Sequence, residues 1–210
     1  MAAQAIPAPT VRLTGPNRRA QLTEVATALF AERGFAGTTM DDVAQAAGVT
    51  KPVVYHHFSS KQALYDELVD KVAAELVVVI SDAAVAAGSP RRQVEDGMAA
   101  YFSYVADHRE AFFLLYGRDG RSDRAGGDPM AAIEDVIIEV VDPLIDADLD
   151  PRYRRVLASA VVSMAEGVAR RWLRLSEGNS AMSRHDEAQD LARAVAALAW
   201  GGLRTVGDRA

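Results

Sequence analysis

The chain has 210 residues, no cysteine and a formal net charge of −6, and it is 50% hydrophobic and 25% charged. This composition is typical of a folded globular protein and argues against long disordered stretches. The absence of cysteine excludes a disulfide scaffold, a thiolate zinc site, an iron–sulfur cluster and a cysteine nucleophile.

Residues 1–16 contain three prolines and several small residues, and we expect them to form a disordered tail. They lack the basic and then apolar pattern of a signal peptide. No apolar run in the chain approaches the roughly 18 residues that cross a bilayer. We therefore expect a cytoplasmic protein that has no membrane partner.

A helix is predicted over residues 18–33, because apolar residues recur there at intervals of three and four. Asn17 is its expected N-cap, and Gly34 its expected end, since glycine readily adopts the left-handed conformation that stops a helix. Further helices are predicted at 39–47, 50–58, 60–87, 90–107, 110–116, 130–147, 151–176 and 185–206. The glycine-rich segment 117–129 is expected to be a loop. No stretch alternates with the period of two that strands require, so the fold class is all-α, with about nine helices.

Charge is unevenly distributed along the predicted helices. Residues 1–61 hold six basic and four acidic side chains, whereas the remainder of the chain is acidic on balance. This pattern suggests that only the N-terminal end of the protein meets a polyanion.

The segment 39–58 predicts two short helices joined by a tight turn at Gly48. Glycine permits the positive φ of such a turn, and the neighbouring alanines let the two helices pack closely. This is helix-turn-helix geometry, in which the second helix enters the DNA major groove. The side chain of lysine neutralises phosphate, and that of valine contacts a thymine methyl. Hydrogen bonds to phosphates or bases come from threonine, tyrosine and histidine. The predicted contacts with double-stranded DNA are therefore Thr39, Thr50, Lys51, Val53, Tyr55 and His56, with Val49, Val54 and Phe58 on the buried side.

The same region carries a series of motifs in register: Gly34-Phe35, Thr38-Thr39, Val43-Ala44, Ala47-Gly48-Val49-Thr50, Tyr55-His56-His57-Phe58, Lys61 and Leu64. It closely resembles the N-terminal DNA-binding domain of TetR-family transcriptional regulators. The matching Lys61 is added to the predicted DNA contacts. Pro52 stands where glycine is common, and Val53 replaces a small or hydroxyl side chain that often reads a base. The resemblance does not extend recognisably over residues 90–210.

The resemblance implies a homodimer that binds a near-palindromic operator, usually as a repressor, and that responds to a small molecule. It implies a DNA-binding domain at 17–62 and an effector-binding and dimerisation domain at 63–210. Effector binding is expected to change the separation of the two recognition helices, which must lie about 34–36 Å apart to enter successive major grooves. A DNA-binding regulator without an effector, and an activator rather than a repressor, remain alternatives.

Aromatic and apolar side chains predict where a small hydrophobic or aromatic effector binds, since such pockets are mostly apolar. They lie on the helices 90–107, 110–116 and 151–176: Tyr101, Phe102, Phe113, Tyr116, Met164 and Trp172. The alternative for each residue is simple core packing. Arg170 and Arg171 interrupt this apolar face; one of them could pair with an anionic ligand, and the alternative is that they are solvated or salt-bridged.

The last two long helices, 151–176 and 185–206, are the expected dimer interface, because this pairing is usual in the family. The last helix carries a wide stripe of leucine, alanine and valine that is able to bury a partner. Packing within one subunit is the alternative for this stripe.

No enzyme, metal site or cofactor is expected. His56 and His57 are adjacent and point in different directions on a helix, which is poor geometry for chelation. Phosphate-binding glycine loops, dinucleotide fingerprints and nucleophile elbows are all absent from the sequence. Catalytic residues are therefore not assigned.

Overall fold

The computed structural model describes residues 15–116, 135, 137–139, 142, 150–176 and 181–207. The helices with defined bounds are α1 (Gly15–Gly37), α2 (Met40–Ala46), α3 (Lys51–His57), α4 (Lys61–Ala86), α5 (Pro90–Asp107), α6 (Arg109–Tyr116), α8 (Pro151–Leu175) and α9 (Ala181–Gly207). Residues 135 and 137–139 are also helical. The described residues contain no strand, which confirms the all-α prediction. Most of the predicted tail, the loop 117–129 and most of the helix 130–147 lie outside the described residues.

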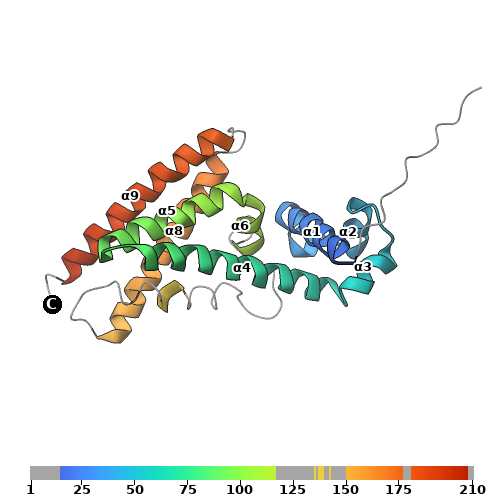
Figure 1. Ribbon diagram of the computed structural model, residues 1–210, viewed down its shortest axis with the longest axis horizontal. Coiled ribbons are helices and arrows are strands. Elements are labelled where there is room, and N and C mark those ends of the chain that lie inside the picture. Colours follow the sequence, from blue (N-terminus) through green and yellow to red (C-terminus); the bar gives the residue numbers. More distant parts are fainter. Residues whose placement is uncertain are drawn as a thin grey trace, which may run out of the picture.

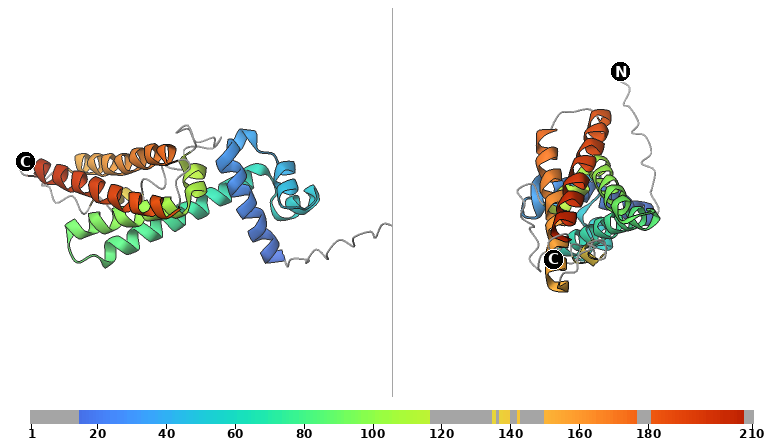
Figure 2. Two further views of the ribbon diagram at one scale, coloured as in Figure 1. Left: turned by 90° about the horizontal axis from the view of Figure 1, so that it is seen from above. Right: turned by 90° about the vertical axis from the view of Figure 1, so that its left-hand side faces the viewer.

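Helix α4 connects the two parts of the molecule (Figure 1). Helices α1, α2 and α3 gather at its N-terminal end, whereas α5 packs along its C-terminal half. Helix α9 lies against α5, and α8 lies beside α9 on the side of the body away from α4 (Figure 2). Helix α6 packs against α1, so the body contacts the N-terminal helices at a second place besides α4.

The hydrophobic core is continuous from the N-terminal helices into the body. Leu22, Val43, Val54 and Leu64 are fully buried where α1 to α4 meet. Burial of each such side chain contributes about 1.5–3 kcal/mol to folding. The Tyr65 hydroxyl donates to a backbone carbonyl of α6, that of Leu114, at 3.2 Å, which links α4 to α6. These contacts hold the three N-terminal helices in a fixed arrangement at the end of α4.

Short local signals set several helix ends where the sequence predicted them. Gly34 has φ 71° and ψ 173°, so the regular part of α1 ends there as expected, although helical residues continue to Gly37. The Ser60 hydroxyl accepts a hydrogen bond from the Ala63 amide and caps α4. Pro90 occupies the first turn of α5, where its missing N–H breaks no helical bond.

Two helix starts differ from the prediction. Asn17 is not an N-cap, because α1 already begins at Gly15. Helix α9 begins at Ala181 rather than at His185, because Ala181–Arg184 join the helix instead of a linker. In the part of the chain that the structure describes, no helix is long and apolar enough to cross a membrane.

Candidate DNA-binding surface

Helices α2 and α3 are held by short-range hydrogen bonds that their sequence encodes. The Thr39 hydroxyl accepts a bond from the Asp42 amide at 3.1 Å, and the Asp42 carboxylate accepts one from the Thr39 amide at 2.8 Å, so the two residues form a capping box. Gly48 has φ 65° in the turn that follows. The Val49 amide donates to the Ala44 carbonyl at 2.9 Å and closes this turn. The arrangement fixes the direction in which α3 leaves α2.

Helix α3 has one buried and one exposed face. Val54 and Phe58 are buried and Val49 is partly buried, as the sequence predicted. Thr50, Lys51 and His56 are exposed, and Tyr55 keeps 45% of its surface accessible. Val53 is only partly exposed. Thr50 is the N-cap residue of α3, but its hydroxyl makes no capping hydrogen bond. The structure therefore brings five of the predicted DNA contacts together on one helix.

Lys51 is paired with an acidic side chain of the preceding helix. Its ammonium lies 2.8 Å from a carboxylate oxygen of Asp41. This hydrogen bond, together with the charge of Asp41, raises the pKa of Lys51 above its ordinary value. Both side chains remain largely exposed, so the pair is solvated and a phosphate is able to compete for the ammonium.

Lys61 makes internal contacts that the sequence did not predict, and Thr39 makes the capping contact with Asp42 that its spacing indicates. The Lys61 ammonium donates to the carbonyls of Phe35 at 2.7 Å and Thr38 at 2.9 Å, and it lies 4.1 Å from the centre of the Phe35 ring. The Thr39 hydroxyl is committed to Asp42, to which it donates at 2.6 Å. Lys61 thus closes the turn between α1 and α2, and its ammonium is bound to backbone carbonyls within the protein.

Arg19 of α1 positions α3, a role that the sequence analysis missed. Its guanidinium donates to the His57 carbonyl at 2.7 Å, pairs with Glu67 of α4 at 2.6 Å and lies 4.4 Å from the centre of the Phe58 ring. These contacts tie together α1, the C-terminal end of α3, and α4. Burial, helped by the charges of His56 and of Arg19, lowers the pKa of His57.

Comparison with known proteins agrees with this geometry. Residues 22–68 match the model of bacterial regulatory proteins of the tetR family. The chain is 28% identical over 197 residues to the HTH-type transcriptional activator FasR of Mycolicibacterium smegmatis, covering 93% of this chain and 87% of FasR. It is 34% identical over 100 residues to the HTH-type transcriptional repressor KstR2 of Mycobacterium tuberculosis, which is half of that protein. A solved TetR-like transcriptional regulator from Rhodococcus sp. RHA1 superposes with a TM-score of 0.74 at 27% identity, covering 92% of this chain and 99% of the other.

Residues 22–68 thus carry the DNA-binding region of the TetR family, and the chain is similar to TetR-family transcriptional regulators over most of its length. Its helix-turn-helix is α2 and α3, and the remaining helices form the rest of a regulator of this fold. Members of the family are DNA-binding regulators of transcription and not enzymes. The described residues contain no group of three or more histidine, aspartate or glutamate side chains placed to hold a metal ion.

In the body of the chain, the residues predicted to touch an effector lie in one hydrophobic cluster. Tyr101, Phe102, Phe113, Tyr116 and Trp172 are buried, and Met164 is partly buried against them. The ring centres of Phe102 and Trp172 are 6.4 Å apart, which joins α5 to α8. The Trp172 indole N–H donates to Glu187 of α9 at 2.8 Å. This packing fits the wall of an apolar pocket and equally fits an ordinary core.

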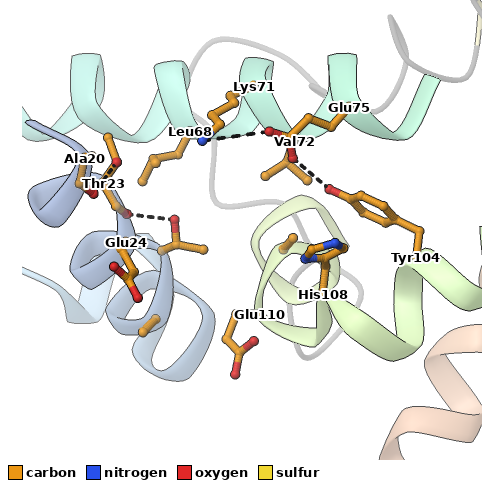
Figure 3. Close-up of a pocket in the computed structure, with 13 residues that line it drawn as sticks. Ala20, Thr23, Glu24, Leu68, Lys71, Val72, Glu75, Tyr104, His108 and Glu110 are labelled. Carbon is orange, nitrogen blue, oxygen red and sulfur yellow. Dashed lines mark hydrogen bonds and ion pairs between the residues drawn. The ribbon is translucent and has the colours of Figure 1, made fainter. Parts of the chain in front are cut away.

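A separate groove lies where the N-terminal helices meet the body (Figure 3). It has a volume of about 740 Å³ and is lined by side chains of α1, α4, the end of α5 and α6. The Tyr104 hydroxyl donates to Glu75 at 3.3 Å on one wall, and Glu24 of α1 and Glu110 lie on the others. None of the predicted effector residues lines it. The groove leaves part of the junction between α1 and the body unfilled by side chains.

Proposed function

We propose that this regulator is a homodimer that places one α3 from each subunit in successive major grooves of a near-palindromic operator. A small hydrophobic or aromatic effector then releases the DNA, which makes the protein a repressor. The exposed face of α3 carries this proposal, because it presents basic, aromatic and hydroxyl side chains on a helix fixed from two sides. We assign DNA binding to residues 17–62 and effector binding and dimerisation to residues 63–210.

The side chains of α3 have two roles: some bind the phosphate backbone and position the helix, and others contact base edges and read the sequence. Lys51 meets the phosphate backbone, since an ammonium contributes charge without discriminating between bases. Thr50, Tyr55 and His56 offer hydroxyl and imidazole groups that hydrogen-bond to phosphates or to base edges. Val53 is partly buried and reaches only a methyl or another apolar edge. The operator sequence is therefore read mainly through the three polar side chains.

Dimerisation through α8 and α9 is supported by apolar side chains that the single subunit leaves exposed. Large hydrophobic residues on these two helices are accessible to solvent: Tyr153, Val156, Leu175, Met182 and Leu198. Helices α8 and α9 lie side by side on one flank of the body (Figure 2). A symmetric pairing of this flank buries these side chains and leaves both α3 helices accessible.

Effector control follows from a shift between two arrangements of the same dimer. A ligand that binds more tightly to the arrangement with the wrong α3 spacing lowers the population that fits the operator. The buried aromatic cluster of α5, α6 and α8 offers an apolar site for such a ligand. Helix α4 and the contact of α1 with α6 connect this cluster to the N-terminal helices, and the groove of Figure 3 lies at that connection.

Activation is the second candidate. The relative that matches over nearly the whole chain, FasR, is named a transcriptional activator, whereas KstR2, named a repressor, matches over about half. The position of the operator relative to the promoter distinguishes the two. Deletion of the gene raises transcription of the adjacent genes if the protein represses them and lowers it if the protein activates them.

Selection of bound genomic fragments by the purified full chain at near-physiological salt tests the DNA proposal. We expect an enriched near-palindrome whose half-sites lie about one helical turn apart. Tyr55→Ala and His56→Ala are expected to lower operator affinity and to leave the dimer intact in sedimentation. Absence of enrichment by a folded dimer, or loss of the dimer in these variants, contradicts the assignment of α3.

A further inference from the structure

The arginine and lysine side chains of the N-terminal helices differ in how their charges are compensated. Five of them lie between residues 15 and 61. Lys61 binds backbone carbonyls, and three others are paired with carboxylates: Arg19, Arg33 and Lys51. Arg18 is paired with no carboxylate of the described residues, and residues 1–14 contain no aspartate or glutamate. Among these five side chains, Arg18 thus keeps the least compensated charge.

The guanidinium of Arg18 is held by a neutral side chain. Its Nη1 donates to the amide oxygen of Gln21 at 2.5 Å, and the Gln21 amide nitrogen donates to the Ala47 carbonyl at 3.3 Å. A guanidinium has five N–H donors, and within the described residues Arg18 uses one of them. Arg18 is partly exposed, so its other donors are open to a partner from outside.

Two observations place Arg18 beside the helix-turn-helix. Ala47, which Gln21 contacts, is the C-cap of α2 and precedes the turn at Gly48. Burial is the main cause of the lowered pKa of His57, and the charge of Arg18 is among the positive charges that add to it. Arg18 is therefore tied to the turn before α3 and acts electrostatically on the last residue of α3. These helices lie together at the N-terminal end of α4 (Figure 1).

A phosphate group matches the free part of this side chain. The planar guanidinium donates two parallel hydrogen bonds to two phosphate oxygens, and its charge is not lost at any pH that the protein meets. Lys51 has to give up its contact with Asp41 to bind a phosphate, whereas Arg18 gives up only water. The bond to Gln21 orients the guanidinium without neutralising it, because an amide carries no charge.

We propose that Arg18 binds one phosphate of the operator backbone in each half-site and that Gln21 positions its guanidinium. The proposal rests on the DNA-binding function proposed above and adds to it a contact from α1, outside the helix-turn-helix. Because Gln21 also holds the Ala47 carbonyl, this contact fixes the turn before α3 relative to the DNA backbone.

The salt dependence of operator binding by the full chain is the first test. Arg18→Gln is expected to lower the slope of log affinity against log salt by about one for each Arg18 that meets a phosphate. Arg18→Lys keeps the charge and is expected to keep the slope. Arg91→Gln is the matched control, since Arg91 is an exposed arginine of the body paired with Glu95, and it is expected to change neither slope nor affinity.

Operator duplexes with a single methylphosphonate, which removes the charge of one phosphate, give the second test. We expect one position in each half-site where this change weakens wild-type binding by about 3- to 10-fold and leaves binding by Arg18→Gln unaltered. Gln21→Ala is expected to reduce the effect at that same position, because Arg18 keeps its charge and loses its orientation. If Gln21 only closed the turn, its removal would lower affinity and leave the pattern across positions unchanged.

Arg18→Gln is expected to unfold at about the wild-type temperature, since no carboxylate loses a partner. A wild-type salt slope in Arg18→Gln, or a dependence on every methylphosphonate position equal to that of the wild type, overturns the proposal. In either case the wild type still selects its operator, so the DNA-binding function stands and Arg18 is only solvated. Failure of the folded wild type to select any operator contradicts the DNA-binding function itself, and the Arg18 contact with it.

Discussion

Replacement of Gly48 tests whether the turn between α2 and α3 depends on the backbone alone. Gly48 has φ 65°, in the left-handed region, and no atom lies within 4 Å of the position that a Cβ would occupy. Gly48→Ala therefore adds no collision and changes only the backbone energies. The variant separates conformational strain from packing at the centre of the helix-turn-helix.

The magnitude follows from two opposing terms. An L-residue in the left-handed conformation costs about 1–2 kcal/mol. Alanine also reduces the freedom of the unfolded chain, which returns about 0.4–1 kcal/mol. We expect a net loss of about 1 kcal/mol in the free energy of unfolding, or about 2–4 °C in Tm for a chain of this size. Gly48→Asn is expected to lose less, because asparagine tolerates the left-handed region.

Urea denaturation followed by circular dichroism measures these differences, at fixed protein concentration because a dimer is expected. Gly97→Ala in α5 is the matched control: the added methyl meets Ile80 at an ordinary 3.9 Å, and the glycine is inside a helix. It is expected to gain about 0.5–1 kcal/mol. An unchanged Gly48→Ala, or a Gly48→Asn that is equally destabilised, refutes the backbone explanation.

The remaining predictions concern DNA contact, helix positioning, core packing and pH. In anisotropy titrations, Lys51→Ala should lower the slope of log affinity against log salt by about one. Lys71 is also exposed and paired with a carboxylate, that of Glu75, and Lys71→Ala should leave the slope unchanged. Arg19→Ala should weaken operator binding while salt dependence stays close to that of the wild type, because Arg19 acts through α3; a slope reduced by one would make it a phosphate contact. Phe102→Ala should lower the free energy of unfolding, measured by urea denaturation, by about 3–5 kcal/mol if Phe102 is packed on all sides. A clearly smaller loss would place Phe102 at the wall of a cavity. Because the pKa of His57 lies below 6.5 in the folded protein, its neutral form favours folding: this contribution is present above pH 6.5 and is lost as pH falls through the folded-state pKa. His57→Gln should therefore lose less stability than the wild type between pH 7.5 and pH 5.5. An equal loss in the two proteins would contradict the lowered pKa of His57.

The parts of the structure that depend on neighbours in sequence were predictable. Gly34, Ser60 and Pro90 mark helix ends because a positive φ, a hydroxyl cap and a missing N–H act within a few residues. The buried and exposed faces of α3 followed from the spacing of Val54 and Phe58 for the same reason. The start of α9 was missed because the polar stretch before His185 resembles a linker, although its residues tolerate a helix.

Contacts between distant segments were not predictable from one sequence. Lys61 reaches a carbonyl 26 residues earlier in the chain, and Arg19 reaches one 38 residues later. Basic residues near a DNA-binding motif suggest phosphate contacts, and only the folded structure gives these two charges an internal role.

The continuity of α4 has a mechanical consequence. Its 26 residues form one uninterrupted rod of about 39 Å, from the DNA-proximal end to the body. Tilting such a rod by about 5° at its body end displaces the far end by about 3.4 Å, the rise of one base pair along the duplex. Side chains near the body end of α4 move by only a fraction of this distance. In the proposed mechanism, an effector that tilts α4 by this angle moves α3 by about one base pair relative to its half-site.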